Sequence, residues 1–377
     1  MIVPTPEPRP DAPPRAPMTH AVPRPAPAPR PAGGASRALS RLAALVAAGA
    51  LTVGLAACGG DAARTTAAAG SGPAEVEVQN CGRPVSFPRP ARRLFVNDGN
   101  MISMALAIGA ARDVAAVSSM QRDAPVLRQH YGAAAVDGLK QVSDTYPSRE
   151  TVLAQRPDVV VAGWNYGWDE TRKLTPAGLA KQGIAAYTLT ESCRQGAGRA
   201  RGVVDPWTAL RTDLTNLGEI TGHETGAARA VADIDARLRA LRAKPRAAKP
   251  PTVFLFDSGT KAVYSSGRFG APQAILDAAG ARNALEDLDD TWTEVSWERV
   301  IASKPDAFLF VDYPPQSFAD KVRVLRSRAG VKDLPAVREG RFLNLPYAMW
   351  TSGPLNIEAA ERARRALEGW GLVPRAD

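Results

Sequence analysis

The feature of the sequence that most constrains the fold is a repeated helix-turn-strand element. The first copy, residues 148–158, reads SRETVLAQRPD and runs into the apolar segment VVV. The second copy, residues 296–306, reads SWERVIASKPD and runs into AFLFV. Each copy has a serine that can cap a helix, a glutamate in the first helical turn, and a Pro-Asp stop before a buried strand. The repeat therefore predicts two lobes built on one α/β plan.

Apolar runs elsewhere in the chain alternate with helical patterns in the same way. Strands are expected at residues 93–96, 114–117, 159–162 and 185–189 in the first lobe, and at 252–257, 308–312 and 341–345 in the second. Such alternation is typical of parallel sheets covered by helices on both faces. The predicted fold class is α/β, with two Rossmann-like lobes.

The segment between the lobes has no strand signals. It predicts a helix over 207–220 and a second over 224–242, whose apolar residues recur at helical spacing before Pro245. A helix of about 19 residues is about 28 Å long, enough to bridge two lobes rigidly. The expected domains are an N-terminal lobe at 75–222, a connecting helix at 223–245 and a C-terminal lobe at 246–377.

The first 57 residues have the layout of a signal peptide. Arg37 and Arg41 precede an apolar run over 42–57, which is shorter than the roughly 20 residues of a spanning helix. The run ends in Leu-Ala-Ala-Cys, which resembles a bacterial lipobox with Cys58 as the lipidated residue. Residues 58–74 are small and polar and predict a flexible tether. We expect an extracytoplasmic protein anchored to the cell membrane, with either Met1 or Met18 as the true start.

Charge and cysteine content narrow the possible partners. The formal net charge is +9, and the six arginines of residues 1–57 against two acids supply +4 of it. The remaining excess of +5 is small and scattered, so we expect no nucleic acid partner. Once Cys58 is lipidated, Cys81 and Cys193 remain as an even pair in an oxidising compartment, and a disulfide between them is the default expectation.

Together, the lipobox, the two lobes, the connecting helix and the repeated Ser-x-Glu-x-x-x-Ala-x-x-Pro-Asp element resemble the helical-backbone class of ABC-importer substrate-binding proteins. The resemblance implies a monomer that delivers a bulky ligand to a permease dimer and its ATPase subunits. Members of that class present one acidic residue at the tip of each lobe to permease arginines. The matching residues are Glu150 and Glu298, which the first helical turn would keep ionised.

Ligands of open α/β sheets bind beyond the carboxyl ends of the strands, where this sequence places many aromatic residues. Flat rings suit a flat ligand, and arginine forks match carboxylate or catecholate oxygens. The candidate ligand-binding residues are Trp164, Tyr166, Trp168, Arg172, Arg268, Trp292, Tyr313, Tyr347 and Trp350. The class handles iron-siderophores, haem and cobalamin, and we expect a ferric siderophore, with cobalamin or another corrinoid, haem or a deazaflavin cofactor precursor as alternatives.

Two rival functions lack the residues they need. An exported hydrolase needs a base beside its nucleophile, but His130 and His223 are the only histidines after the leader and neither lies in a catalytic motif. A zinc- or manganese-binding protein of similar architecture needs several histidines and carboxylates at its cleft. We therefore expect no catalytic residues, no metal site and no cofactor, apart from a metal that the ligand itself carries.

Overall fold

A computed structural model describes residues 74–375 of the protein, and both copies of the repeat fold as a capped helix followed by a buried strand. In the first copy the Ser148 hydroxyl accepts a hydrogen bond from the Thr151 N–H at the start of α4 (Arg149–Ala154), which leads into β6 (Val159–Trp164). In the second the Ser296 hydroxyl caps α9 (Trp297–Ser303), which leads into β13 (Ala307–Asp312). The predicted signal peptide, Cys58 and most of the predicted tether lie outside the described residues.

The first lobe is built on a parallel sheet. Its strand order is β5-β4-β3-β6-β7, with β8 also paired to β6. Val160 at the centre lies opposite Phe95 on one side and Ala186 on the other. Helices α1 (Gly99–Ala107), α2 (Ala124–Tyr131), α3 (Ala133–Asp137) and α5 (Pro176–Ala180) belong to this lobe. Besides β6, the strands are β3 (Leu94–Asn97), β4 (Val114–Ser118), β5 (Gln141–Ser143), β7 (Gly167–Trp168) and β8 (Ala185–Thr188).

An antiparallel hairpin precedes this sheet, formed by β1 (Glu75–Asn80) and β2 (Arg83–Pro88). Its two-residue turn places Cys81 at a φ of 52° and Gly82 at 74°, and positive φ at both positions is what a tight hairpin turn requires. Cys81 forms a disulfide with Cys193, as predicted. The bond ties the hairpin tip to the segment after β8.

The second lobe contains a parallel sheet and a separate pair of strands. The sheet has the order β11-β9-β13-β14, and β10 (Val263–Ser266) pairs antiparallel with β12 (Trp292–Val295). Its helices besides α9 are α8 (Ala271–Ala279), α10 (Phe318–Ser327), α11 (Pro335–Arg338) and α12 (Asn356–Gly369). The sheet strands besides β13 are β9 (Thr252–Phe256), β11 (Arg282–Asn283) and β14 (Phe342–Pro346). The β10–β12 pair was not among the predicted strands.

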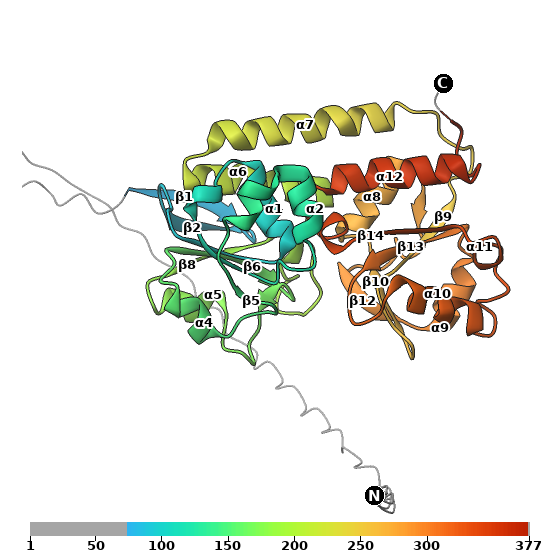
Figure 1. Ribbon diagram of the computed structural model, residues 1–377, viewed down its shortest axis with the longest axis horizontal. Coiled ribbons are helices and arrows are strands. Elements are labelled where there is room, and N and C mark those ends of the chain that lie inside the picture. The colour runs from blue at the N-terminus through green and yellow to red at the C-terminus, as the bar shows by residue number, and fades with distance from the viewer. Residues whose placement is uncertain (1–73, 376–377) are drawn as a thin grey trace, which may run out of the picture. The chain divides into compact units, whose positions relative to one another are not determined.

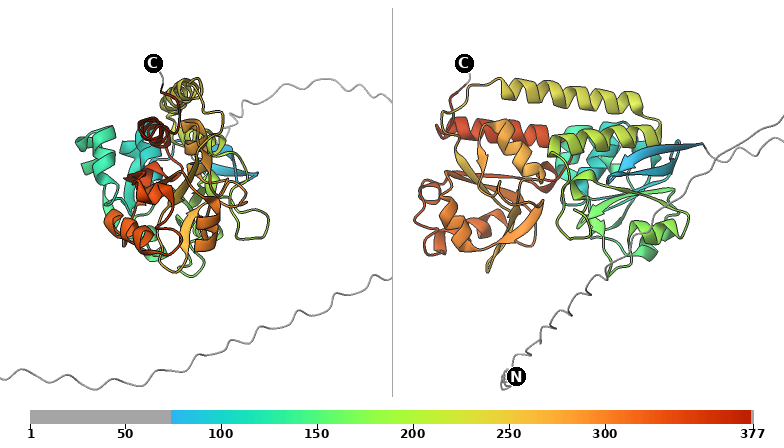
Figure 2. Two further views of the ribbon diagram at one scale, coloured as in Figure 1. Left: turned by 90° about the vertical axis from the view of Figure 1, so that its right-hand side faces the viewer. Right: turned by 180° about the vertical axis from the view of Figure 1, so that it is seen from behind.

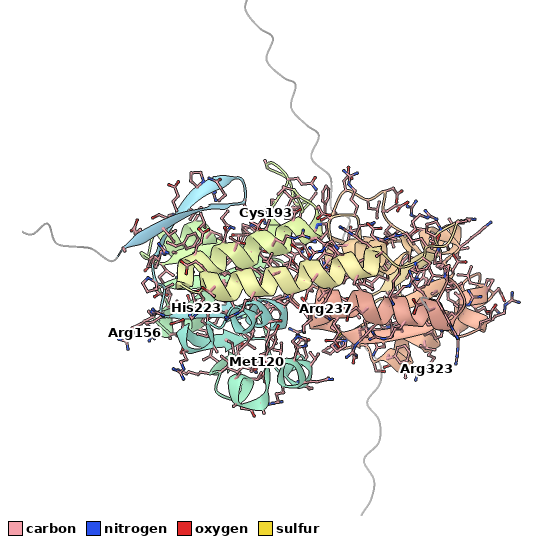
Figure 3. The ribbon with its side chains drawn as sticks, turned by 90° about the horizontal axis from the view of Figure 1, so that it is seen from above. Met120, Arg156, Cys193, His223, Arg237 and Arg323 are labelled. Carbon is pink, nitrogen blue, oxygen red and sulfur yellow. A yellow bond between two sulfur atoms is a disulfide. The ribbon has the colours of Figure 1, made fainter. Side chains whose placement is uncertain are left out.

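The connecting helix is α7 (Glu224–Arg242), which follows α6 (Pro206–Thr221) and has the predicted bounds. It runs along the top of both lobes, over α6 on one side and toward α12 on the other (Figures 1 and 2). Arg237, labelled in Figure 3, pairs with Glu361 of α12 at 2.7 Å, and Arg211 of α6 pairs with Asp235 of α7 at 2.6 Å. Ion pairs thus hold α7 to both lobes.

One apolar core continues from the first lobe into the second. A single cluster of buried side chains includes Val96 and Val161 of the first sheet together with Leu255 and Leu309 of the second. Shared packing of this kind resists a large hinge motion between the lobes. No helix within residues 74–375 has the length and apolar character needed to cross a membrane.

Candidate functional site

A cavity of about 210 Å³ lies between the lobes, and we call it the inner cavity. Five of its eleven lining residues follow directly after parallel strands: Asn165 and Tyr166 after β6, Asp257 after β9, Tyr313 after β13 and Tyr347 after β14. The carboxyl ends of both sheets therefore meet at one site, and ligands of open α/β sheets bind beyond such strand ends. The remaining lining residues are Tyr146, Arg201, Ser258, Tyr264, Trp292 and Thr351.

A second space of about 360 Å³ adjoins the inner cavity, and we call it the outer basin. The two share Asn165, Arg201 and Trp292 as lining, so they have a common wall. The outer basin is more polar and opens among exposed side chains. Its other lining residues are Trp164, Trp168, Asp169, Glu170, Thr171, Arg194, Arg199 and Asp290.

A third hollow of about 750 Å³ is lined by the first lobe alone, between the β1–β2 hairpin, β8 and α5. It receives no residue from the second lobe. It does not lie at the carboxyl ends of the second sheet, so we place the candidate site at the inner cavity and outer basin instead.

Arg201 joins the two lobes at the shared wall. Its guanidinium donates to the carbonyl of Trp292 at 2.6 Å and to that of Trp164 at 3.4 Å, and its Nε lies 3.7 Å from the Asp290 carboxylate. The side chain is 4% exposed, which is rare for an arginine unless its charge is matched. Arg201 thus holds both tryptophan backbones that flank the site.

Glu191 makes a second link between the lobes. Its carboxylate accepts hydrogen bonds from the Tyr166 hydroxyl at 3.0 Å and from the backbone N–H of Ala271, the first residue of α8, at 2.9 Å. The residue is 1% exposed, and this burial raises the pKa of Glu191 to about 7. A carboxylate at a helix start also benefits from the helix dipole.

A third buried group fixes the tyrosines on the other side of the cavity. Asp98 accepts hydrogen bonds from Arg122 at 3.0 Å, Tyr146 at 2.8 Å and Tyr347 at 3.3 Å. The Arg122 guanidinium lies 4.6 Å from the ring centre of Tyr313 and 5.0 Å from that of Tyr347. Burial raises the pKa of Asp98, and the charge of Arg122 acts against that rise. Three of the cavity's rings are therefore held in place before any ligand arrives.

Six of the nine predicted ligand-binding residues line the site, and Trp168, which lines the outer basin, is almost fully buried. Tyr166, Trp292, Tyr313 and Tyr347 line the inner cavity. Trp164 lines the outer basin, where the Arg194 guanidinium lies 3.4 Å from its ring centre. The Arg194 side chain would have to share this ring with a stacking ligand or leave it.

Trp168 and the three predicted residues outside the site have different surroundings. Trp350 is completely buried, and its indole N–H donates to the carbonyl of Phe310 at 3.0 Å, so it lies in the core rather than at the cavity. Trp168 borders the outer basin but is 2% exposed and donates to Thr188. Arg172 and Arg268 line neither space and pair with Asp169 and Asp289 on the surface.

Arg201, Glu191 and Asp257 are site residues that sequence reasoning does not single out. Charged side chains are usually exposed, and nothing local marks these as buried. Among residues 74–375, no group of three or more His, Cys, Asp or Glu side chains is arranged to hold a metal ion.

Glu150 and Glu298 occupy equivalent positions at the first turns of α4 and α9. Figure 1 shows these helices at the bottom of the two lobes, on the face opposite α7. A hydrogen bond from the backbone N–H of Glu150 lowers the pKa of its own carboxyl. A hydrogen bond from the Ser296 hydroxyl lowers the pKa of Glu298. Both carboxylates are exposed, and that of Glu150 lies 3.3 Å from the Arg149 guanidinium.

Comparison with known proteins places this geometry in context. Residues 98–348 match a family model described as periplasmic binding protein. Similar solved structures include a periplasmic binding protein from Veillonella parvula, with a TM-score of 0.65 and 23% identity over 78% of this chain and 98% of that chain. An ABC-type Fe3+-hydroxamate transport system structure from Saccharomonospora viridis has a TM-score of 0.65 and 21% identity over 78% and 98%. The molybdate-binding protein MolA of Haemophilus influenzae has a TM-score of 0.61 and 19% identity over 78% and 92%.

Proposed function

The chain belongs to the periplasmic binding protein family, and we propose that it captures a ferric siderophore between its lobes and delivers it to an ABC importer. Members of this family are extracytoplasmic, non-enzymatic solute-binding proteins that work with ABC transporters. The observation that carries the proposal is the joint site of inner cavity and outer basin, lined by aromatic side chains of both lobes and by buried Arg201.

A chelate suits this site better than a bare ion. The described part of the chain offers no three-residue metal cluster, so iron would have to arrive inside an organic ligand. Arg194, Arg199 and Arg201 border the outer basin, and guanidinium groups bind the oxygens of hydroxamate or catecholate groups through charge-assisted hydrogen bonds. The likeness to the hydroxamate transport structure from Saccharomonospora viridis supports the same ligand class.

Haem, cobalamin or another corrinoid, and a deazaflavin cofactor precursor are the alternative ligands. Haem would need an axial ligand such as a tyrosine. The hydroxyls of Tyr166 and Tyr347 already donate to Glu191 and Asp98, which leaves Tyr313 as the better axial candidate. The other five aromatic side chains of the inner cavity do not distinguish between haem, a corrinoid and a deazaflavin cofactor precursor.

We further propose that Glu150 and Glu298 dock the loaded protein on a permease dimer with attached ATPase subunits. The exposure and equivalent helix-start positions of the two carboxylates support this role. Lipidation at Cys58 would hold the protein, as a monomer, at the membrane that carries its permease.

Tryptophan fluorescence tests the ligand assignment directly. The purified protein is titrated with ferric hydroxamate and catecholate siderophores, haemin and cobalamin. We expect saturable quenching by a ferric siderophore that weakens in Trp164→Ala and Trp292→Ala, but not in Trp370→Ala, which removes a half-buried ring at the end of α12. A response to haemin or cobalamin with none to siderophores would keep the importer function and refute the siderophore.

A further inference from the structure

We propose that the inner cavity binds a cationic group of the ligand, an ammonium or quaternary ammonium, with Asp257 as its counter-charge. The placement of a cation in the cavity rests on the geometry of the cavity alone. That this cation belongs to a ferric siderophore rests on the proposed function.

Asp257 is a buried acid that faces the cavity without an ion pair. It follows the last residue of β9, lines the inner cavity and is 5% exposed. Its backbone N–H donates to the carbonyl of Tyr264 at 3.1 Å, which fixes the turn that carries it. Across residues 74–375, no nitrogen of a lysine, arginine or histidine lies within 4.0 Å of its carboxylate. A buried carboxylate in this position is costly unless something supplies a positive charge.

Two cations act on Asp257 from beyond 4.0 Å, and both direct their hydrogen bonds elsewhere. The Lys321 ammonium donates to the backbone carbonyls of Val311 and Tyr313, and Arg122 pairs with Asp98 at 3.0 Å. Burial raises the pKa of Asp257, while the Ser258 hydroxyl, Lys321 and Arg122 lower it only in part. A cation brought into the cavity would favour the carboxylate form and be held by it.

Two other buried acids near the site have their hydrogen-bond partners within the protein. Asp213 accepts hydrogen bonds from Tyr187 and Thr190, and Glu191 accepts them from Tyr166 and Ala271. Neither of them lines the inner cavity. Asp257 is the acid that lines the inner cavity, where a cation from outside the protein can reach it.

The rest of the lining is aromatic, and aromatic faces attract cations. Five of the chain's seven tyrosines border this small space. Trp292, whose indole attracts cations more strongly than a phenol does, stacks with Tyr264 at 6.0 Å between ring centres. The Arg122 guanidinium already lies over Tyr313 and Tyr347, so these rings accept a cation on one face within the protein itself.

The volume matches one end of a ligand rather than a whole chelate. About 210 Å³ is smaller than the roughly 300 Å³ at which sites for drug-sized ligands begin. The chelate would occupy the outer basin, which shares three lining residues with the cavity. Arg201 borders both spaces, but its guanidinium is bound to the carbonyls of Trp164 and Trp292 and lies beside Asp290, so it leaves the charge of Asp257 unmatched.

A pair of ferric chelates that differ only in charge tests the proposal. Ferrioxamine B carries a free ammonium on a trihydroxamate chelate, and its N-acetyl derivative carries the same chelate without the charge. By fluorescence titration we expect at least tenfold tighter binding of ferrioxamine B. The preference should fall below twofold in Asp257→Asn but persist in Asp312→Asn, which removes an exposed carboxylate at the end of β13. Thermal unfolding tests whether both variants fold. The comparison of the two chelates on the unaltered protein does not depend on either variant.

A second pair separates this proposal from the siderophore proposal. Choline and 3,3-dimethylbutan-1-ol have nearly the same shape, and only choline is charged. If neither chelate binds, the hydroxamate assignment fails, and at least tenfold tighter binding of choline that Asp257→Asn removes still supports the cation site. If both chelates bind equally and choline shows no preference over the alcohol, the siderophore proposal stands and the cation site is refuted.

Discussion

Replacing Glu191 with glutamine should make the free energy of unfolding less dependent on pH. The carboxyl is buried between the lobes, and burial raises its pKa from 4.5 to about 7. The folded chain therefore holds a proton that the unfolded chain has lost, so this group's stabilising contribution is fully present below pH 4.5 and is lost as pH rises through about 7. Between pH 5 and pH 8 the loss amounts to about 2.5 kcal/mol.

Urea denaturation at pH 5, 6, 7 and 8 measures this difference. We expect the free energy of unfolding of Glu191→Gln to change with pH by about 1.5–2.5 kcal/mol less than that of the unaltered protein. Burial also raises the pKa values of Asp123 and Asp213 to about 7, but both residues are present in both proteins and cancel in the comparison. Glu294→Gln, at an exposed position of β12, is the control and should leave the pH dependence unchanged. Parallel pH profiles for Glu191→Gln and the unaltered protein would refute the reasoning.

Three other predictions follow from the geometry. Removal of the disulfide by Cys81→Ala with Cys193→Ala should cost about 4–5 kcal/mol in urea denaturation, because the bond closes a loop between residues 112 positions apart; a loss under about 1 kcal/mol would contradict this. Glu150→Gln with Glu298→Gln should reduce ligand transport by a reconstituted importer at least about tenfold at unchanged affinity, and undiminished transport would rule out docking through these residues. Arg201→Lys cannot keep the forked contacts to two carbonyls and should weaken binding of the ferric siderophore about 5- to 50-fold in fluorescence titration, whereas equal affinity would exclude a role for the fork.

The main elements of the fold could be predicted because their signals are local. Ser148 and Ser296 each cap a helix, and both helices end before a buried apolar strand. The helix predicted at 224–242 has these bounds in the structure, since its apolar spacing and the following prolines mark both its face and its end. Strand β14 begins one residue after its predicted start, at Phe342, a difference typical of element boundaries.

The strand pair β10–β12 is harder to predict from the sequence. Each strand has four residues, and a segment that contains α8 and β11 separates them. Short strands joined over a long connection have no turn signal between them. In the structure Trp292 lies on strand β12 rather than in a free loop, and its ring stacks on that of Tyr264 in β10.

The buried charges of the site are beyond local sequence reasoning for a different reason. Arg201 bonds to Trp292, 91 residues away, and Glu191 bonds to Ala271, 80 residues away. Each side chain is buried and hydrogen-bonded to the second lobe, and no local sequence pattern reports that contact. Trp350 shows the converse error, since a ring placed after a strand looks available for ligand but turns into the core to reach the Phe310 carbonyl.

The same interlobe contacts limit how the site can open. Glu191 links Tyr166 to the start of α8, and Asp98 links Arg122 and Tyr146 to Tyr347, so hydrogen bonds to buried acids cross between the lobes on two sides of the inner cavity. A hydrogen bond to a charged group contributes about 1.5–3 kcal/mol, so separating the lobes costs several kcal/mol that ligand contacts must offset. The helix α7 and the shared core add to that resistance. Neither Glu191 nor Asp98 lines the inner cavity or the outer basin, so a ligand with a small cationic end in the cavity and its chelate in the basin would leave both links intact.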